Sequence, residues 1–474
     1  MRLHASKLDL PLPTSSFPSP YPSSPAAAVS SLLFEPSSHS LALMLVDSSA
    51  LLYPSLSPGP SHSPSPTAVP PPSTAACFLR LLPSNRVVFL SASPLAAGSA
   101  VQLRSWILAP RCGGASSTFA PARLDYRNER DQPAVTLGFR HGHTVRLVGS
   151  VNAFVIHSSA ANQIWVMAAR PASAEKGTVH LVKCAVIELT LPIYSITLST
   201  RSMLLGEVDG VRVFPLWPLL KGRISKSRDV GHRKASASME DICNKNLPNG
   251  LVIPKTSLVP ESGSRCDCSG SGQEAEAEGK TDGCSAPHKL KIVRIRQDSG
   301  DLYSFFVVIK RPESQNYKVQ AGVPTSSKAV CIHVLSQKKY LILDSTGDLH
   351  VLKLKDSGMS LEPTSQFSMF SEDAHLYHLD NVMEVQLLAT LPDTSSKTQF
   401  VWLSDGGYSI HLISLDDTET TVGEGDNDEN KQKASIFSVV GAIFTSEKIQ
   451  DIVPISTNSC LVLCQGNMFI YGIA

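Results

Sequence analysis

Short runs of large apolar residues, each interrupted by a small polar turn, recur along the chain. Leu341–Leu354 reads LILDSTGDLHVLKL, with two apolar runs flanking the polar segment Asp344–Asp348. A tight antiparallel turn needs residues that adopt positive φ or that bond their own backbone, and Asp, Gly, Asn and Ser serve this purpose. The pattern predicts a β-hairpin in which Asp344 and Gly347 form the turn and do no chemistry.

Six further stretches repeat this pattern. They are Leu41–Leu56, Val87–Leu108 (with a longer turn), Phe154–Ala169, Met203–Pro218, Phe400–Leu415 and Cys460–Ala474. Another short apolar strand precedes each of the seven copies, in the order Ala28–Pro36, Ala76–Pro83, His143–Val151, Ile193–Thr200, Ala329–Ser336, Met383–Leu391 and Ile449–Ser456. The repeating unit is therefore strand, short link, strand, tight turn, strand.

The middle strand of each unit is apolar almost throughout, which indicates burial on both faces, as in sheets packed face to face. Seven such units predict an all-β fold, a seven-bladed β-propeller in which ring closure protects the strand edges. The last unit ends without an outer strand, and Leu3–Leu12 (LHASKLDLPL) is expected to supply it, closing the ring in the last blade. The alternative is a set of unrelated hairpins in one or two β-sandwiches.

Dipeptides near the turns resemble those of the WD40-like β-propeller superfamily. Gly142-His143 precedes a blade strand, and Asp209-Gly210 and Asp405-Gly406 are similar to the tight blade turns. No Trp-Asp closes any unit, and the units recur every 50–70 residues or so, against about 40–45 in regular WD40 arrays. The resemblance is one of fold, and it implies a rigid scaffold whose loops bind partners.

Four segments complete the expected organisation of residues 1–474 as a single propeller. Residues 54–74 are a Pro/Ser-rich loop, 221–287 a polar, disordered insertion within or after blade 4, and 416–433 an acidic loop. Lys289–Gln297 (KLKIVRIRQ) resumes the strand pattern and is interpreted as the delayed outer strand of the fourth blade.

Composition narrows the classes of function. The 42 basic and 41 acidic residues leave a formal net charge of +1, which gives no global electrostatic reason for binding nucleic acid or a membrane surface. No apolar run reaches the roughly 18–20 residues of a membrane span. Five cysteines lie inside apolar runs (Cys77, Cys184, Cys331, Cys460 and Cys464), which indicates buried thiols and a reducing compartment, cytoplasm or nucleus. The Ser-rich N-terminus leaves organelle targeting open as an alternative.

The insertion opens with a basic loop. Its cations are Lys221, Arg223, Lys226, Arg228, Arg233 and Lys234. They could bind phosphates or act as a nuclear import signal, although no aromatic residue interleaves them for base stacking. Ser236, after Arg233-Lys-Ala, is a candidate phosphosite, since a phosphate there would alter the contacts of the basic run. The alternative is a solubilising loop.

Metal and catalytic motifs are weak. Cys266, Cys268, Cys284 and His288 supply the ligand types of a zinc site in a Gly/Ser-rich context that favours free thiols. His141 and His143 would share one side of a strand but have no third metal ligand by sequence.

Candidate catalytic carboxylates are few. Asp125–Asp131 is interpreted as a solvated loop. The first strands carry few carboxylates, Glu35, Glu384 and Asp451. No cofactor is expected.

The sequence therefore predicts a non-catalytic protein–protein interaction scaffold within a multi-protein complex, with oligomeric state unknown. Two alternatives stay open. One is a nuclear nucleic-acid- or chromatin-associated propeller subunit that uses the basic loop. The other is a propeller hydrolase or lyase, which would require carboxylates or histidines to converge at the channel mouth.

Overall fold

A computed structural model describes most of the strand-forming segments of the chain. The described residues are 3–10, 29–56, 65–95, 98–109, 117–127, 129–142, 144–172, 177–221, 292–298, 304–309, 326–354, 374–379, 384–391, 398–416 and 437–473. The chain divides into two units, Met1–Arg223 with Ile292–Ala474, and Ile224–Lys291. All described residues belong to the first unit, and the predicted insertion at 221–287 lies outside them except for Lys221.

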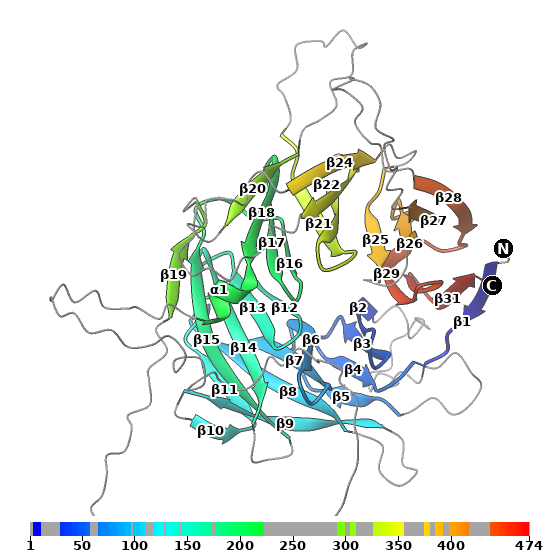
Figure 1. Cartoon of the computed structure of the whole chain (residues 1–474). Helices are drawn as coiled ribbons and strands as arrows, with labels where there is room; N and C mark the ends of the chain where they lie inside the picture. Colours follow the sequence, from blue (N-terminus) through cyan, green and yellow to red (C-terminus); the bar gives the residue numbers. More distant parts are fainter. Residues whose placement is uncertain are drawn as a thin grey trace, which may run out of the picture. The chain divides into compact units, whose positions relative to one another are not determined.

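Four-stranded antiparallel sheets dominate the first unit (Figure 1). The first contains β2 (Val29–Glu35), β3 (Ser40–Leu45), β4 (Ala50–Tyr53) and β5 (Thr67–Val69). The next contains β16 (Ser195–Leu198), β17 (Ser202–Glu207), β18 (Gly210–Pro215) and β20 (Phe305–Val308). Two more contain β21 (Ala329–Val334), β22 (Lys339–Asp344), β23 (Leu349–Leu354) and β24 (Ala374–Leu379), then β25 (Leu387–Thr390), β26 (Thr398–Ser404), β27 (Ser409–Asp416) and β28 (Phe437–Phe444).

The last four-stranded sheet joins the two ends of the chain. It contains β29 (Ile449–Ser456), β30 (Ser459–Cys464) and β31 (Met468–Ile473), and β1 (Leu3–Lys7) pairs with β31 from Leu3 opposite Ile473 to Lys7 opposite Phe469. The predicted pairing of the N-terminal segment with the last unit is therefore present. β1 covers the edge that β31 would otherwise expose.

One larger sheet of eleven strands takes up the chain between β5 and β16. It contains β6 (Ala75–Leu81), β7 (Arg86–Pro94), β8 (Val101–Ala109), β9 (Thr118–Tyr126), β10 (Glu129–Gln132), β11 (Ala134–Leu137), β12 (Val145–Gly149), β13 (Ala153–Ser158), β14 (Gln163–Pro171), β15 (Thr178–Glu188) and β19 (Val293–Arg296). It holds two meanders of the predicted kind, β6–β7–β8 and β12–β13–β14–β15.

Strand β9 connects these two meanders. Its first half pairs antiparallel with β8, with Ala122 opposite Ser105, and its second half pairs parallel with β15, with Arg123 opposite Thr178 and Tyr126 opposite Leu181. Because β9 leaves β15 after Tyr126, the outer edge of β15 is free for β19, which pairs from Val293 opposite Ala185. One continuous strand thus pairs with both meanders.

The first strands of successive meanders contact one another in a closed cycle. β2 contacts β6, and the contacts continue through β12, β16, β21, β25 and β29 back to β2. The approach is close enough to require glycine: a Cβ on Gly149 of β12 would lie 2.1 Å from the Phe78 carbonyl oxygen of β6. Together with the meander sheets, this cycle makes the fold a β-propeller, and it confirms the predicted resemblance to WD40-like propellers at the level of fold.

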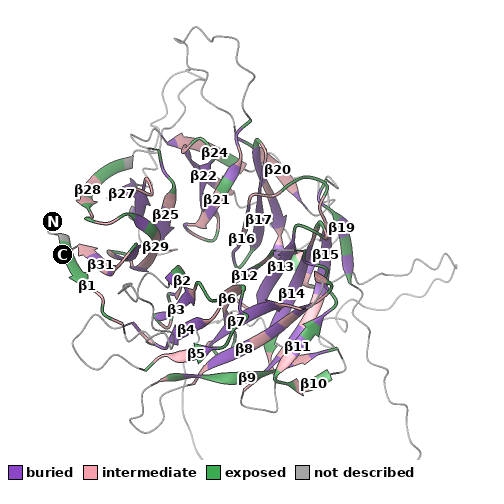
Figure 2. Cartoon of the chain, turned by 180° about the vertical axis from the view of Figure 1, so that it is seen from behind, coloured by how far each residue is buried: buried purple, intermediate pink, exposed green. Residues whose placement is uncertain are grey.

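The middle strands are buried on both faces, as their apolar sequences predict (Figure 2). β22, for example, is buried at all six positions. In the hairpin Leu341–Leu354, Leu349 and Val351 pack in one apolar cluster, and Leu352 with Leu354 packs in the next. The third strand of this hairpin therefore packs against both neighbouring blades.

Two local predictions were wrong. Lys289–Gln297 does not complete the fourth unit, because β19 pairs with β15 of the preceding meander, and Phe305–Val308 (β20) pairs with β18 instead. Within the Pro/Ser-rich segment 54–74, Thr67–Val69 forms the fourth strand of the first sheet, with Val69 buried. The apolar run that ends Met203–Pro218 continues into a short helix, α1 (Leu216–Lys221), which buries Leu216 and Leu219.

Candidate functional site

The turn between β22 and β23 is held by the buried carboxylate of Asp344. Its Oδ1 accepts hydrogen bonds from Thr346 N at 2.9 Å, Thr346 Oγ1 at 2.5 Å and Asp348 N at 3.0 Å. Gly347 adopts φ 86° in the same turn. Both residues are therefore turn-formers, as the sequence predicts, and Asp344 satisfies backbone donors that would otherwise be unpaired.

The second oxygen of Asp344 connects the turn to its surroundings. Ser327 Oγ donates to Oδ2 at 2.7 Å, and His350 Nε2 lies 3.3 Å from the same atom. Burial alone would raise the pKa of Asp344, but these bonds, chiefly the one with His350, hold it well below its usual range. The arrangement contains a serine, a histidine and an aspartate, yet the serine donates to the carboxylate. A nucleophilic serine instead requires the histidine as its base.

The carboxylates of the first strands serve separate structural purposes. Glu35 accepts bonds from Ser37 and Ser38 in its own turn. Asp451 on β29 accepts the backbone N–H of Leu32 on β2 at 2.8 Å and so ties two neighbouring first strands together. Burial raises the pKa of Asp451, whereas the hydrogen bonds from the backbone N–H groups of Leu32 and Ile452 act to lower it. Glu384 is exposed. These three carboxylates therefore do not assemble the convergent site that a propeller hydrolase requires.

The predicted histidine pair precedes β12 in a loop. The His141 side chain is buried, and the backbone N–H of His141 donates a hydrogen bond to the Gly98 carbonyl oxygen at 2.9 Å. His143 lies outside the described residues. Within the described part of the chain, no group of three His, Cys, Asp or Glu side chains is placed to hold a metal ion.

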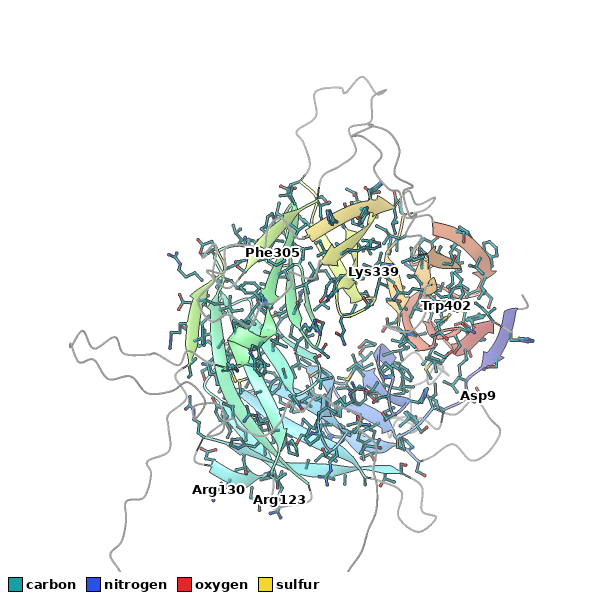
Figure 3. All side chains as sticks on the ribbon, viewed as in Figure 1. Asp9, Arg123, Arg130, Phe305, Lys339 and Trp402 are labelled. Carbon is teal, nitrogen blue, oxygen red and sulfur yellow. The ribbon has the colours of Figure 1, made fainter. Side chains whose placement is uncertain are left out.

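Asp125–Asp131 was predicted to be a solvated loop, and the prediction was wrong. Tyr126 ends β9 and Glu129 begins β10, and the two strands pair as a hairpin. Arg123 and Asp131 form an ion pair across it. Arg123 and Arg130 extend from this outer edge of the sheet (Figure 3). Residues 122–126 (ARLDY) alternate apolar and charged side chains, a strand signal that the charged composition of the following residues obscured.

Of the site residues predicted in the insertion, Lys221 is described by the structure. Lys221 ends α1, where its Nζ lies 4.6 Å from the centre of the Trp217 ring. The remaining residues of the basic loop, the candidate phosphosite and the zinc candidates lie outside the described residues: Arg223, Lys226, Arg228, Arg233, Lys234, Ser236, Cys266, Cys268, Cys284 and His288. These remain predictions, as does the acidic loop after Asp416.

The predicted buried thiols are found in the structure. Four of the five described cysteines are buried, Cys331 is partly exposed, and all five are free. Burial raises the pKa of Cys77 to about 12 and that of Cys331 to about 11, so these thiols stay protonated and unreactive at neutral pH.

A hollow of about 510 Å³ opens where three first strands begin, and sequence reasoning did not find it. Its walls are the starts of β2, β25 and β29 and the turns that follow β3, β26 and β30. The lining residues are Val29, Ser30, Val46, Gln386, Leu387, Gly406, Lys448, Ile449, Gln450 and Gln465. Lys448 is the one charged side chain among them, so the hollow presents amide and apolar groups and has no acid–base pair.

Three exposed apolar side chains lie on the turns and strands around this hollow. Val46, on its wall, is 70% exposed, and Tyr408, two residues after Gly406, is 57% exposed. Phe444 is 78% exposed and lies on β28 opposite Ser409, the residue after Tyr408. The Tyr408 carbonyl accepts the backbone N–H of Thr445 at 2.8 Å, which holds the two backbones side by side. Because successive residues alternate, the Tyr408 and Phe444 side chains extend from opposite faces of the sheet.

Among known proteins, the chain is similar to solved structures at low sequence identity. No protein-family model and no curated protein matches the chain. Among solved structures, the Myceliophteria thermophila Cps50 (Swd1) beta-propeller domain is 8% identical over 94% of this chain and 96% of that one, with a TM-score of 0.43. U3-55K is 9% identical, covers 96% of each chain and has a TM-score of 0.40. Kluyvelomyces marxianus Hsv2 is 8% identical over 82% of this chain and 72% of that one, with a TM-score of 0.34.

At these identities the comparisons carry no inference about partners. The described residues include no helix of the length and hydropathy that a membrane crossing needs.

Proposed function

We propose that the chain is a non-catalytic interaction scaffold, a seven-bladed propeller that holds other proteins in a complex. The blade count is supported by the cycle of first strands, β2, β6, β12, β16, β21, β25 and β29, each in contact with the next. In this reading the eleven-stranded sheet is two blades joined by β9.

The observation that carries the scaffold proposal is the hollow together with the exposed apolar side chains of Val46, Tyr408 and Phe444 on the turns and strands around it. Large apolar side chains that stay exposed are typical of protein-binding surfaces, and Tyr and Phe are enriched at the centres of such surfaces. The hollow next to them offers a recess for an apolar side chain of a partner, with Gln386, Gln450 and Gln465 as hydrogen-bonding groups around it.

The buried carboxylates of the blades also support the scaffold proposal, because they serve structure. Asp344, Glu35 and Asp451 are occupied by turns and by neighbouring strands, so they contribute rigidity. A rigid framework lowers the entropic cost of binding, because the surface loops are already positioned.

A matched pair of variants tests the proposal. The double variant Tyr408→Ala/Phe444→Ala is expected to fold normally and to lose, or bind at least tenfold more weakly, one or more proteins that co-purify with the intact chain. Leu191→Ala removes an apolar side chain that is 50% exposed on the link before β16, away from the hollow's lining, and is expected to change nothing. An unchanged set and amount of partners for the double variant would refute this surface as the binding site.

A further inference from the structure

Three cationic side chains meet at the outer edge of β15, where one partner strand ends and the next begins. β9 pairs with β15 as far as Tyr126 opposite Leu181, and β19 begins at Val293 opposite Ala185. Between these pairings, residues 182–184 of β15 have no strand partner on that side. Lys183 lies in this notch.

Register brings two arginines to either end of the notch. Arg127 follows Tyr126 at φ 59°, where the chain turns away from β15, and Arg294 lies opposite Val186. At about 3.3 Å per residue, Lys183 is within roughly 10 Å along the strand of both positions, a gap that Lys and Arg side chains can span. The pKa of Lys183 is lowered to about 8 by burial and by the charges of Arg294 and Arg127, in agreement with this placement.

Two carboxylates lie near these cations by register, since Glu129 is opposite Tyr126 and Glu188 is two residues beyond Val186. Among the described residues, neither Lys183 nor Arg127 forms an ion pair, and Arg294 reaches Glu188 only at 3.9 Å. Asp125 and Arg123 alternate with Tyr126 along β9 and so lie on its opposite face. A half-buried cation repelled by two others is unfavourable unless an anion neutralises it.

Two buried rings form the floor beneath the cations. Lys183 Nζ lies 2.9 Å from the centre of the Trp165 ring, and the Arg127 guanidinium lies 5.1 Å from that of Tyr126. The rings are 7% and 5% exposed, and each is already covered by a cation, so neither is free to stack on a nucleic-acid base. The Tyr126 hydroxyl is buried with no hydrogen-bond partner in the described structure, which leaves one more donor at the notch.

We propose that Lys183, Arg127 and Arg294 form a binding site for a phosphate group, free or carried by a phosphorylated side chain. Two planar guanidinium groups and one ammonium supply more positive charge and more donors than a carboxylate can use, and they match a phosphate dianion with its three terminal oxygens. The site does not depend on the scaffold function, because inorganic phosphate alone suffices to test it.

Differential labelling tests the site in the full-length protein. Lys183 is acylated with an N-hydroxysuccinimide ester with and without millimolar inorganic phosphate, and the modification is quantified by peptide mass spectrometry. Phosphate is expected to slow labelling of Lys183 at least fivefold and to leave exposed Lys448 unaffected. Equal labelling of Lys183 in both conditions would overturn the site.

Binding measurements with matched variants add a second readout. Lys183→Met keeps an unbranched side chain over Trp165 and is expected to lower phosphate affinity at least tenfold, whereas Lys183→Arg is expected to retain it. A phosphoserine peptide and its unphosphorylated form distinguish the source: tighter binding of the phosphopeptide than of inorganic phosphate supports a protein-borne group, and equal binding supports a free one. Affinity that Lys183→Met leaves unchanged would overturn the proposal and leave the scaffold function untouched.

Discussion

The carboxylate of Asp344 is expected to be a main source of stability in its blade. Asp344 is 2% exposed and accepts bonds through both oxygens. Asp344→Asn keeps one acceptor oxygen but replaces the other with an N–H₂ group, so Ser327 Oγ and His350 Nε2 lose the acceptor they share. Bonds to a charged acceptor contribute about 1.5–3 kcal/mol each, so the variant should lose about 3–5 kcal/mol of unfolding free energy.

Denaturant unfolding followed by tryptophan fluorescence measures this loss, with Asp348→Asn as the matched control in the same turn. Asp348 accepts a single bond, from Thr346 Oγ1, in an exposed position, so its variant should lose less than about 1 kcal/mol. Equal losses for Asp344→Asn and Asp348→Asn would refute the role assigned to Asp344.

The free energy of unfolding measured at acid pH provides an independent check on the role of the Asp344 carboxylate. The pKa of Asp344 is depressed in the folded chain, so its contribution is complete above the unfolded pKa of about 3.9 and is lost as the pH falls below it. The stability difference between the native chain and Asp344→Asn should therefore shrink at acid pH. A difference that stays constant would show that shape, and not charge, is responsible.

Two further predictions concern other blades. Gly149→Ala should destabilise the chain by about 1–3 kcal/mol, since the new Cβ would meet Phe78 O at 2.1 Å, whereas Gly138→Ala, where nothing lies within 4 Å, should be neutral in the same unfolding assay. Burial and the charge of Arg146 lower the pKa of His157 to about 4, so the unfolded chain takes up the proton first as the pH falls. The free energy of unfolding is therefore unaffected by His157 above about pH 6.5 and falls by up to about 3 kcal/mol towards pH 4. His157→Gln should flatten that part of the stability–pH curve, and an unaltered curve would contradict the assignment.

Strand positions could be predicted from the sequence because apolar runs and turn residues are local signals. Each of the seven predicted hairpins and each preceding strand is present, including the hairpin at Leu341–Leu354. The pairing of the outer strands could not be predicted in the same way. β19 and β20 are both short and strand-like, and which sheet each joins depends on the edge that β9 leaves open on β15, a tertiary fact.

The candidate surfaces were hidden for a related reason. Tyr408 and Phe444 are far apart in sequence from Val46 and read as ordinary strand residues, and Lys183 reads as one cation in an apolar run. Their significance comes from the register of β27 with β28 and from the position at which β9 departs from β15. Basic and acidic loops, by contrast, are visible from composition alone, whatever their function.

The strand shared between two blades also limits how this chain can be rebuilt. Repeat proteins are usually modular, and a single repeat can be excised, duplicated or exchanged with little effect on its neighbours. Here a graft of one blade would divide β9 between Ala122 and Arg123 and remove half of the next blade's outer strand. Residues 75–188 are therefore the smallest continuous cassette that keeps both meanders and β9 together, and β19 must be supplied with it because β19 pairs with β15. Recombination within the cassette should be as damaging as a break in the core.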